Sequence, residues 1–461
     1  MTLIKSISGI RGTIGGKPGD NLTPIDAVKF AGAFGHWLKK KGKGQGKVVV
    51  GRDARISGKM IMELINNTLN ALGLDVVCLD YATTPTVEMA VPEEKALGGI
   101  VLTASHNPKQ WNALKLLNNK GEFISGSDGV EVLELVENGD FSFAPVDELG
   151  TTVYNDTYNT FHINKILQLD LIDTKAIKKA NFTVAIDCVN SVGGIIIPDL
   201  LKKLGVAKVV ELYTEPTGEF PHNPEPLPAH LIEISEMVKK EKADLGFVVD
   251  PDVDRLAIIN EDGGMFGEEY TLVAVADYIL QHKQGNTVSN LSSSRALRDV
   301  TQTQGGQYTP AAVGEVHVVE MMRKTNAIIG GEGNGGIIYP ALHYGRDALV
   351  GIALFLSYLA KSGKRASALR AGYPSYFMSK NKIELTPSID VDGLLEKIKN
   401  KYRNEQVTDI DGVKIDFTHE WVHLRKSNTE PIIRIYTEGK SQDKADALAE
   451  RIMEEINELQ K

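Results

Sequence analysis

Cysteine is scarce in this sequence, with only Cys78 and Cys188 among 461 residues. Each follows a short apolar run, and this pattern predicts a buried free thiol beside a strand. Two such cysteines do not indicate the disulfide framework of a small secreted domain. The composition therefore fits a protein of a reducing compartment.

Long apolar runs are also absent. No stretch of the sequence has the length and hydrophobicity needed to cross a bilayer. The first residues, Met1 to Ser6, lack the apolar core of a secretory signal peptide. We therefore expect a cytoplasmic protein that makes no contact with a membrane.

An excess of positive charge is missing as well, because 60 Asp and Glu outnumber 51 Lys and Arg and give a net charge of −9. A nucleic-acid-binding protein would normally carry a basic domain, so we expect no nucleic-acid partner. A small anion can still bind, because a few Arg and Lys side chains can form a local positive site inside an acidic protein.

Strand and helix patterns alternate along most of the chain. Helices are predicted at 23–42 and 60–72, and short apolar strands at 48–50, 76–79, 99–102, 182–186, 209–212, 245–249 and 256–259. Such alternation predicts α/β layers with parallel or mixed sheets. Nearer the C-terminus, closely spaced strands at 413–417, 421–424 and 432–436 precede an amphipathic helix at 441–459, which predicts a separate α+β domain.

The length and these patterns predict four domains of ordinary size. We expect α/β domains at 1–150, 151–254 and 255–371 and an α+β domain at 372–461.

Polar residues crowd the loop after the predicted strand at 99–102. Thr103, Ser105, His106 and Asn107 follow its carboxyl end, where open α/β sheets place their ligands. Pro108 restricts Asn107 to an extended conformation, so we expect Ser105 on a constrained loop. Ordinary turn chemistry explains this run equally well when it is considered alone.

Three carboxylates, Asp250, Asp252 and Asp254, occupy alternate positions directly after another predicted strand. In an extended loop, alternate side chains share a side, so the three can converge. Converging carboxylates repel one another, and a hard divalent cation is their natural partner. An EF-hand is excluded, because Arg255 stands where that loop needs Gly. A solvated acidic turn is the plainer alternative.

A glycine-rich loop follows at residues 330–336. Its five glycines allow a backbone to approach a ligand closely. Glu332 and Asn334 are the only side chains there that can form hydrogen bonds, and they suit the hydroxyls of a sugar. A flexible loop without function explains this composition at least as well.

A fourth polar loop, Arg425 to Pro431, contains Ser427, Asn428 and Thr429, and Arg434 follows shortly after. Guanidinium, hydroxyl and amide donors together make a cradle for an anion, and a phosphate monoester is the expected guest. A plain polar hairpin turn is the alternative.

Taken in this order, the four loops resemble those of the α-D-phosphohexomutase family. The similarity extends over essentially the whole chain and includes shorter matches at 9–13, 51–53 and 112–115. The family implies three related α/β domains with mixed sheets and a C-terminal α+β domain around a central cleft. It also implies an enzyme that interconverts hexose 6-phosphate and hexose 1-phosphate through a phosphoserine and a bisphosphate intermediate.

The family further implies roles for single residues. Ser105 would carry the phosphate, and the three Asp residues would hold Mg²⁺ together with an oxygen of that phosphate. The remaining residues of the transfer site would be Arg11, Lys115 and Arg255. Lys115 is the first candidate for the general acid or base and His317 the second, while His106 would position the loop beside the substrate.

Two more sets would bind the substrate. Glu332 and Asn334 would contact the sugar hydroxyls. The non-reacting phosphate would be held by Arg425, Ser427, Asn428, Thr429 and Arg434. A sugar 1,6-bisphosphate would act as activator, the partner would be a small sugar phosphate, and the protein would be a monomer or a homodimer.

The sequence departs from the commoner family pattern at a few positions. Pro251 and Val253 replace Gly and Ala in the metal loop, and Asn428 replaces Gly in the phosphate loop. Asn334 and Gly336 stand where the sugar loop usually has Ser and His. This combination resembles the archaeal type of phosphoglucosamine mutase.

We therefore expect interconversion of glucosamine 6-phosphate and glucosamine 1-phosphate. A mutase for glucose or mannose phosphates is the first alternative. A metal-dependent phosphatase with Ser105 as a transient nucleophile is a second, and a non-catalytic sugar-phosphate-binding protein is a third.

Overall fold

A computed structural model describes residues 2–6, 9–42, 44–384, 390–426 and 432–459 of the chain. These residues form two compact units. The first unit comprises Met1–Tyr278 and Asn334–Leu369, and the second comprises Ile279–Gly333 and Arg370–Lys461.

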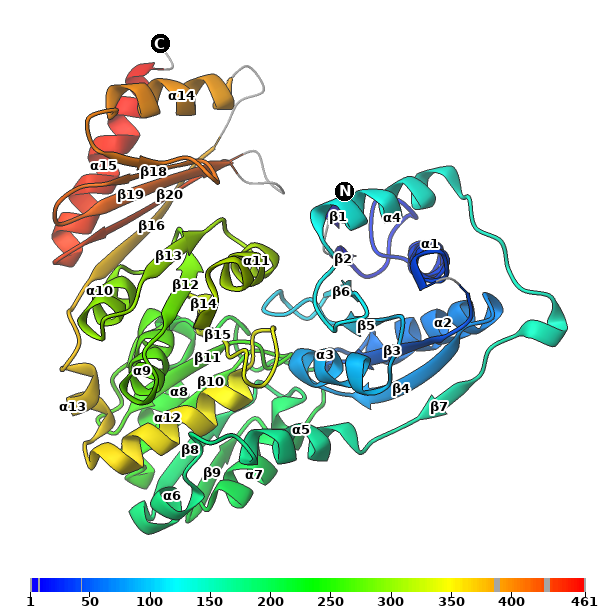
Figure 1. Ribbon diagram of the computed structural model, residues 1–461, viewed down its shortest axis with the longest axis horizontal. Helices are drawn as coiled ribbons and strands as arrows, with labels where there is room; N and C mark the ends of the chain where they lie inside the picture. The colour runs from blue at the N-terminus through cyan, green and yellow to red at the C-terminus, as the bar shows by residue number, and fades with distance from the viewer. Residues whose placement is uncertain (1, 7–8, 43, 385–389, 427–431, 460–461) are drawn as a thin grey trace. The chain divides into compact units, whose positions relative to one another are not determined.

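The first unit contains two mixed sheets (Figure 1). The larger sheet has the strand order β1-β2-β6-β5-β3-β4-β7. Strands β5, β3, β4 and β7 are parallel neighbours, whereas β1, β2, β6 and β5 pair in antiparallel fashion. The strands are β1 (Ile4–Ser6), β2 (Gly9–Thr13), β3 (Lys47–Arg52), β4 (Asp75–Tyr81), β5 (Gly98–Leu102), β6 (Trp111–Leu117) and β7 (Thr152–Tyr154).

Helices cover both faces of this sheet because its central strands are apolar on both sides. Val48 and Val50 of β3 pack with α1 (Pro24–Gly42), α2 (Gly58–Ala71) and α4 (Gly126–Asn138). Val49, between them in sequence, packs on the opposite face with α3 (Thr84–Glu93). The lysines at 39–41 lie in the last turn of α1, where the helix dipole favours positive charge.

The second sheet of this unit has the order β11-β10-β8-β9, with β11 antiparallel and the other three strands parallel. Its strands are β8 (Thr183–Asp187), β9 (Lys208–Leu212), β10 (Leu245–Val249) and β11 (Leu256–Asn260). The remaining elements of the unit are α5 (Tyr158–Leu167), α6 (Thr174–Ala180), α7 (Gly193–Leu204), α8 (Ile232–Glu241), β15 (Gly336–Ile338) and α12 (Ala348–Ser362). Helices α9 (Glu268–His282) and α13 (Ala366–Arg370) include residues of both units.

The second unit begins with three parallel strands, in which β12 (Asn286–Asn290) lies between β13 (Tyr308–Ala311) and β14 (Ala327–Glu332). Helices α10 (Ala296–Thr303) and α11 (Glu315–Thr325) accompany these strands.

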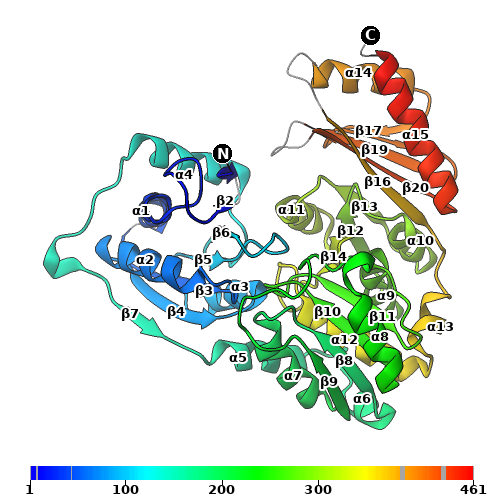
Figure 2. The ribbon, with the colours of Figure 1, turned by 180° about the vertical axis from the view of Figure 1, so that it is seen from behind.

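An antiparallel sheet of order β16-β20-β19-β18-β17 completes this unit. Its elements are β16 (Phe377–Glu384), α14 (Val391–Lys401), β17 (Gln406–Thr408), β18 (Val413–Asp416), β19 (Trp421–Lys426), β20 (Ile432–Gly439) and α15 (Gln442–Leu459). Figure 2 shows α14 and α15 on one face of this sheet. Leu424 and Ile433 pack with these helices, so the alternate positions, including Arg425 and Arg434, belong to the other face.

The predicted fold class is confirmed, with α/β layers of mixed sheets followed by a C-terminal antiparallel sheet and its helices. Sequence patterns did not locate β1, β2 and β6, which form the antiparallel edge of the first sheet, and they also did not locate β7 and β12 to β17. These strands are short or mix polar with apolar residues, so their periodicity is weak. The boundaries predicted for the four domains stay a prediction, because a division into two compact units does not test them.

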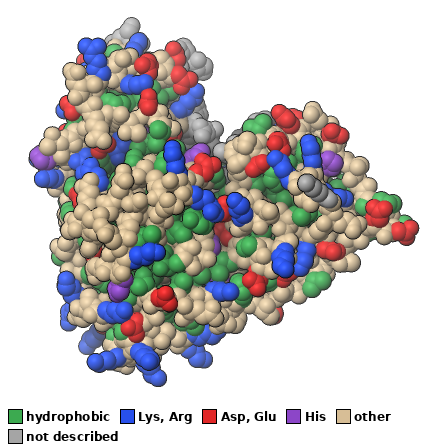
Figure 3. Space-filling view, viewed as in Figure 1, with side chains coloured by type: hydrophobic (Ala, Val, Ile, Leu, Met, Phe, Trp, Pro, Cys, Tyr) green, Lys and Arg blue, Asp and Glu red, His purple; other side chains and the backbone are tan. Residues whose placement is uncertain are grey.

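Both cysteines are buried free thiols, as predicted, one inside β4 and one directly after β8. In the described part of the chain no helix is both long and apolar enough to cross a membrane. Figure 3 shows positive and negative side chains interspersed over the face drawn.

Candidate active site

Ser105 lies on a tight turn directly after β5. Its φ of 48° is in the left-handed region, which is unusual for a residue other than Gly, Asn or Asp. The backbone N–H of Ser105 donates to Thr103 Oγ1 at 2.9 Å, and its hydroxyl donates to Asp250 Oδ2 at 2.7 Å. The serine is 8% exposed, so the fold holds its hydroxyl against a carboxylate at the rim of a buried site.

A buried arginine, Arg55, holds the backbone of this turn through hydrogen bonds. Its guanidinium donates to the carbonyl oxygens of four residues, and it also pairs with the buried Asp53 at 3.0 Å. Those carbonyls belong to Ser105, Asn107, Pro108 and Trp111. Asp53 in turn accepts from Thr103 Oγ1 at 2.7 Å. The backbone of the Ser105 loop is therefore fixed by one planar, multivalent donor.

The three predicted carboxylates converge, and their oxygen atoms lie within 4.8 Å of one another. The loop that carries them is a turn and not the extended segment that we expected, because Val253 has a φ of 63°. Asp250 Oδ1 stabilises the turn by accepting from the backbone N–H groups of Asp254 and Arg255, each at 3.1 Å. Convergence thus results from a closed turn rather than from strand-like alternation.

Cationic side chains partly balance this negative charge. Lys115 Nζ lies 2.7 Å from Asp252 Oδ2 and 3.4 Å from Asp254 Oδ2. Arg346 Nη2 pairs with the same oxygen of Asp254 at 2.7 Å. Thr84 Oγ1, in the first turn of α3, donates to Asp252 Oδ2 at 2.5 Å.

The pKa values of these groups reflect the crowding. Burial, with Asp254 and Asp252 adding to it, raises the pKa of Asp250 well above its usual range. Burial acts the same way on Asp252, but the Lys115 ammonium overcomes it and holds the pKa of Asp252 below its usual value. Burial opposes the charged form of Lys115, yet Asp252 and Asp254 raise its pKa above the ordinary value. Lys115 therefore keeps its proton in this arrangement.

The residues present fit a hard divalent cation. Asp252 Oδ1 and Asp254 Oδ1 are buried and have no hydrogen-bond partner within the described part of the chain. An unpaired buried carboxylate oxygen is costly, and a cation bound to both oxygens would remove that cost. Mg²⁺ takes oxygen ligands of this kind and keeps other positions for water or phosphate.

Arg11 contacts the loop of Ser105, His106 contacts Ser105 itself, and Arg255 pairs with Glu225, while their roles stay predictions. Arg11 Nη1 lies 3.5 Å from Asn107 Oδ1 and Arg255 Nη1 lies 3.5 Å from Glu225 Oε1. Burial and the positive charges of Arg255 and Arg11 lower the pKa of His106 to about 2. His106 is therefore neutral, and its Nδ1 lies 3.4 Å from Ser105 Oγ.

The sugar-loop residues make local contacts. In the second unit, Glu332 is buried at the end of β14, and its Oε1 accepts from Asn290 Nδ2 at 2.8 Å and from the N–H of Gly314 at 3.2 Å. In the first unit, Asn334 Oδ1 accepts from the N–H of Gly336 at 3.2 Å.

Arg425 and Arg434 lie on adjacent strands in the second unit. Arg425 and Arg434 are direct partners in the register of β19 and β20, so two like charges share one face. Arg425 Nη1 pairs with Asp411 Oδ2 at 3.3 Å. Ser427, Asn428 and Thr429 lie outside the described residues. His317 lies on α11 in the second unit, its side chain is 44% exposed, and its candidacy as acid or base stays a prediction.

Sequence reasoning missed several residues that contact the Ser105 loop and the Asp cluster, notably Arg55, Thr84 and Arg346. Arg55 follows residues 51–53, a short match to the family pattern. That match marked the segment, but nothing in the sequence marked Arg55 itself. No signal marked Arg346 or Thr84, because their partners are about 90 and 170 residues away in the sequence.

Comparison with protein families gives four matches in chain order, all described as phosphoglucomutase/phosphomannomutase domains. The α/β/α domains I, II and III match residues 3–143, 160–264 and 267–376, and the C-terminal domain matches residues 387–455.

Full-length relatives carry related names. The chain is 36% identical over 440 residues to a phosphoglucomutase/phosphomannomutase of Thermococcus kodakarensis, with 94% of this chain and 95% of that protein covered. It is 33% identical over 463 residues to a phosphoglucosamine/phosphogalactosamine mutase of Sulfurisphaera tokodaii, covering 98% and 97%. Among solved structures, a phosphoglucomutase/phosphomannomutase family protein of Burkholderia thailandensis is similar with a TM-score of 0.84 and 27% identity, covering 99% and 96%.

Proposed function

Because the chain belongs to the phosphoglucomutase/phosphomannomutase family, whose members are phosphohexomutases, we propose that it interconverts glucosamine 6-phosphate and glucosamine 1-phosphate. The observation that carries the reaction is the contact between Ser105 Oγ and Asp250 Oδ2 at 2.7 Å, within a cluster of three buried carboxylates. A serine held there can exchange a phosphoryl group next to a bound cation.

The chemistry needs positioning and charge neutralisation more than a strong nucleophile. Asp250, Asp252 and Asp254 would hold Mg²⁺, which when bound offsets charge on the transferring phosphoryl group. Arg11 and Arg255 would bind its remaining oxygens. Phospho-Ser105 would give its phosphoryl group to a sugar hydroxyl, and after the bisphosphate turns around, the other phosphate would return to the serine.

Lys115 is the candidate general acid or base. While it pairs with Asp252 and Asp254 it retains its proton, and so it can donate one to the serine oxygen as the phosphoryl group leaves. A base role requires the carboxylates to turn toward the cation, because losing its anionic partners would lower the pKa of Lys115.

Arg425 and Arg434 would hold the phosphate that does not react. Two arginines opposite each other on adjacent strands repel, and a doubly charged anion between them would turn that repulsion into attraction. This pair favours a mutase over a phosphatase, because hydrolysis of one phosphate needs no second phosphate site.

The hexose is proposed from two observations. Several archaeal relatives that align over nearly the whole chain at 30–32% identity are named probable phosphoglucosamine mutases. The sugar loop also carries Asn334 and Gly336 in place of the more usual Ser and His. Glu332 and Asn334 would contact the sugar. The name of the Thermococcus relative makes glucose and mannose phosphates the alternative substrates.

The test supplies purified protein, Mg²⁺ and a trace of sugar 1,6-bisphosphate with glucosamine, glucose or mannose 1-phosphate in separate reactions. Phosphorus NMR should show conversion to the 6-phosphate, fastest for glucosamine. Release of inorganic phosphate without isomerisation would contradict the mutase assignment, and equal rates with glucose 1-phosphate would contradict the choice of hexose.

Two variant pairs separate the roles of the sites. Ser105→Ala should lower kcat by a factor of about 10³ or more, because the covalent carrier is lost, whereas Ser127→Ala, on the exposed start of α4, should leave it unchanged. Arg425→Ala should raise KM at least about tenfold by removing a charged phosphate contact. Lys399→Ala, which removes a cation of α14 on the opposite face of the sheet, is its control.

A further inference from the structure

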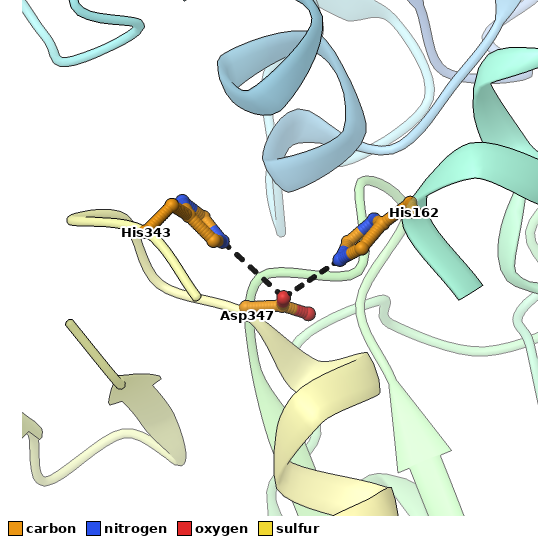
Figure 4. A group of neighbouring side chains, drawn as sticks. All are labelled: His162, His343 and Asp347. Atoms are coloured by element: carbon orange, nitrogen blue, oxygen red, sulfur yellow. Dashed lines mark hydrogen bonds and ion pairs between the residues drawn. The ribbon is translucent and has the colours of Figure 1, made fainter. Parts of the chain in front are cut away.

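A second group of potential metal ligands lies in the first unit, and the proposed phosphoryl transfer does not use it. It consists of His162 in α5, His343 in the segment before α12, and Asp347, the N-cap residue of α12 (Figure 4). The side chains of His162 and Asp347 are fully buried, and that of His343 is 13% exposed.

The two imidazoles present the same nitrogen to one carboxylate oxygen. His162 Nε2 lies 2.9 Å from Asp347 Oδ2, and His343 Nε2 lies 3.2 Å from the same oxygen. Figure 4 shows the rings pointing toward the carboxylate from two sides. The three potential ligand atoms all lie within 4.8 Å of one another.

We propose that His162 Nε2, His343 Nε2 and Asp347 Oδ2 bind a divalent transition-metal ion of the zinc type. Two imidazoles and a carboxylate are ligands that zinc prefers, at about 2.0–2.2 Å from the ion. Ligand atoms around a tetrahedral ion at those distances are roughly 3.4 Å apart, close to the two nitrogen–oxygen separations observed. Small rotations of the two rings would bring the nitrogens to that spacing.

The outer partners of both histidines fit this role. Metal-bound imidazoles commonly donate their second N–H to an oxygen, which fixes the tautomer and the ring orientation. His162 Nδ1 lies 2.9 Å from Thr86 Oγ1, and His343 Nδ1 lies 3.5 Å from Oε2 of the buried Glu88. Each ring can therefore carry its proton on Nδ1 and leave Nε2 free for a metal.

Asp347 is held in place independently of the histidines. Its Oδ1 accepts from the N–H groups of Leu349 and Val350 at 2.8 and 3.2 Å, which caps α12 and leaves Oδ2 for the ion. Asp347 and Glu88 place two carboxyl groups beside the two imidazoles, and a divalent cation would offset negative charge on them.

The cluster adjoins elements of the phosphoryl-transfer site. Arg346 precedes Asp347 and pairs with Asp254, and the N–H of Ala348 donates to the carbonyl of Val253 at 3.2 Å. A bound ion would join α5 to the start of α12 and so stabilise the segment that supports the Asp250–Asp254 turn. Its role would be structural, because no reacting group lies among its ligands.

The experiment measures metal binding directly. Protein stripped with a chelator is kept in millimolar Mg²⁺, so that the hard-cation site is occupied, and is then titrated with Zn²⁺ and separately with Co²⁺. We expect one equivalent of tightly bound Zn²⁺ by mass spectrometry of the desalted protein. The Co²⁺ form should show the intense visible absorption of a four-coordinate site.

Variants identify the ligands. His343→Gln should weaken Zn²⁺ binding at least tenfold, while His36→Gln, a partly buried histidine of α1 outside the cluster, should not change it. Asp254→Asn should retain the Zn²⁺ equivalent, because it alters only the hard-cation site. Asp347→Asn keeps an oxygen that caps α12 but loses the carboxylate, and it should also weaken binding.

Absence of a bound equivalent in the wild-type protein would overturn the proposal, as would equal binding by wild type, His343→Gln and Asp347→Asn. Loss of the equivalent in Asp254→Asn alone would assign the ion to the other cluster and also contradict it. Circular dichroism of each variant verifies that it is folded. None of these outcomes depends on whether the proposed mutase activity is found.

Discussion

Arg55 shows that one buried side chain can fix the backbone conformation of a loop to which it does not belong. Its guanidinium has no solvent exposure and donates to four carbonyl oxygens as well as to Asp53. The left-handed conformation of Ser105 is costly on its own, and these bonds stabilise it.

Replacing Arg55 should therefore harm both stability and catalysis. Arg55→Ala leaves the Asp53 carboxylate buried without its cation, so we expect the free energy of unfolding to fall by about 3–5 kcal/mol. Arg55→Lys keeps a charge but not the planar fork, and should lower kcat more than it changes KM. Urea denaturation and steady-state kinetics measure the two effects.

Lys109→Ala serves as the comparison, because the side chains of Lys109 and its partner Glu219 are 54% and 58% exposed. The loss of an ion pair that is exposed to this degree should cost much less stability. Equal losses in the Arg55 and Lys109 variants would contradict the role given to Arg55.

At the residue scale, the sequence predicted the candidate reacting and metal-binding residues better than the residues that hold them in position. Ser105 and the three Asp residues were identified from residue type and position, Lys115 was named from the family resemblance, and the structure brings all five together. Arg346 and the cluster of His162, His343 and Asp347 were not, because they depend on contacts between segments far apart in the chain, which no local pattern encodes.

Strand β19 has one face that packs in an apolar core and one face that is polar. Its alternate residues Val422 and Leu424 pack under α14 and α15, whereas His423 and Arg425 belong to the other face. His423 is 2% exposed and hydrogen-bonds through both nitrogens, to Ser292 Oγ at 2.9 Å and to the carbonyl of Asp411 at 2.7 Å. The strand is thus polar yet buried on that face.

This burial makes the second unit sensitive to acid. Burial lowers the pKa of His423 to about 4, against the opposing effect of its bond to Asp411 and with help from Lys414. Since the unfolded chain binds this proton below pH 6.5 and the folded chain only near pH 4, stability is lost as pH falls through that window. The loss is at most about 1.4 kcal/mol per pH unit.

Denaturation of wild type and His423→Gln at pH 7, 6 and 5 measures this effect, and the variant should show the smaller acid loss. His222 provides a comparison of opposite sign. Burial lowers its pKa, but Asp187 overcomes that and raises it. The contribution of His222 should therefore be present at low pH and disappear as pH rises. Parallel pH profiles for wild type and His423→Gln would contradict the prediction.

Elements with strong periodicity were predicted to within a few residues. The C-terminal helix was expected at 441–459 and runs from Gln442 to Leu459. The edge strands β1 and β2 were missed, because they are three and five residues long and owe their existence to pairing with each other and with β6. Pairing of that kind is a tertiary property.

At the scale of the whole molecule, the thiols of both cysteines are buried within the first unit. Burial raises the pKa of Cys78 and, far more, that of Cys188. Since the thiolate is the reactive form, both cysteines should be inert in the folded protein.

A colorimetric thiol reagent at pH 8 should therefore label close to no cysteine in the native protein and both after denaturation in guanidinium. The native labelling rate then reports how often the first unit opens. Fast labelling of either thiol in native buffer would show that its burial is not maintained in solution.

The support of the Ser105 turn by Arg55 has a consequence for protein design. The six residues from Thr103 to Pro108 do not determine their own conformation. The side chain that fixes this loop, Arg55, lies about fifty positions earlier in the sequence. Grafting that run alone onto another α/β scaffold should give a loop of the right composition and the wrong conformation. A transplant would have to include Asp53 and Arg55, at the end of the adjacent strand, as an inseparable second part.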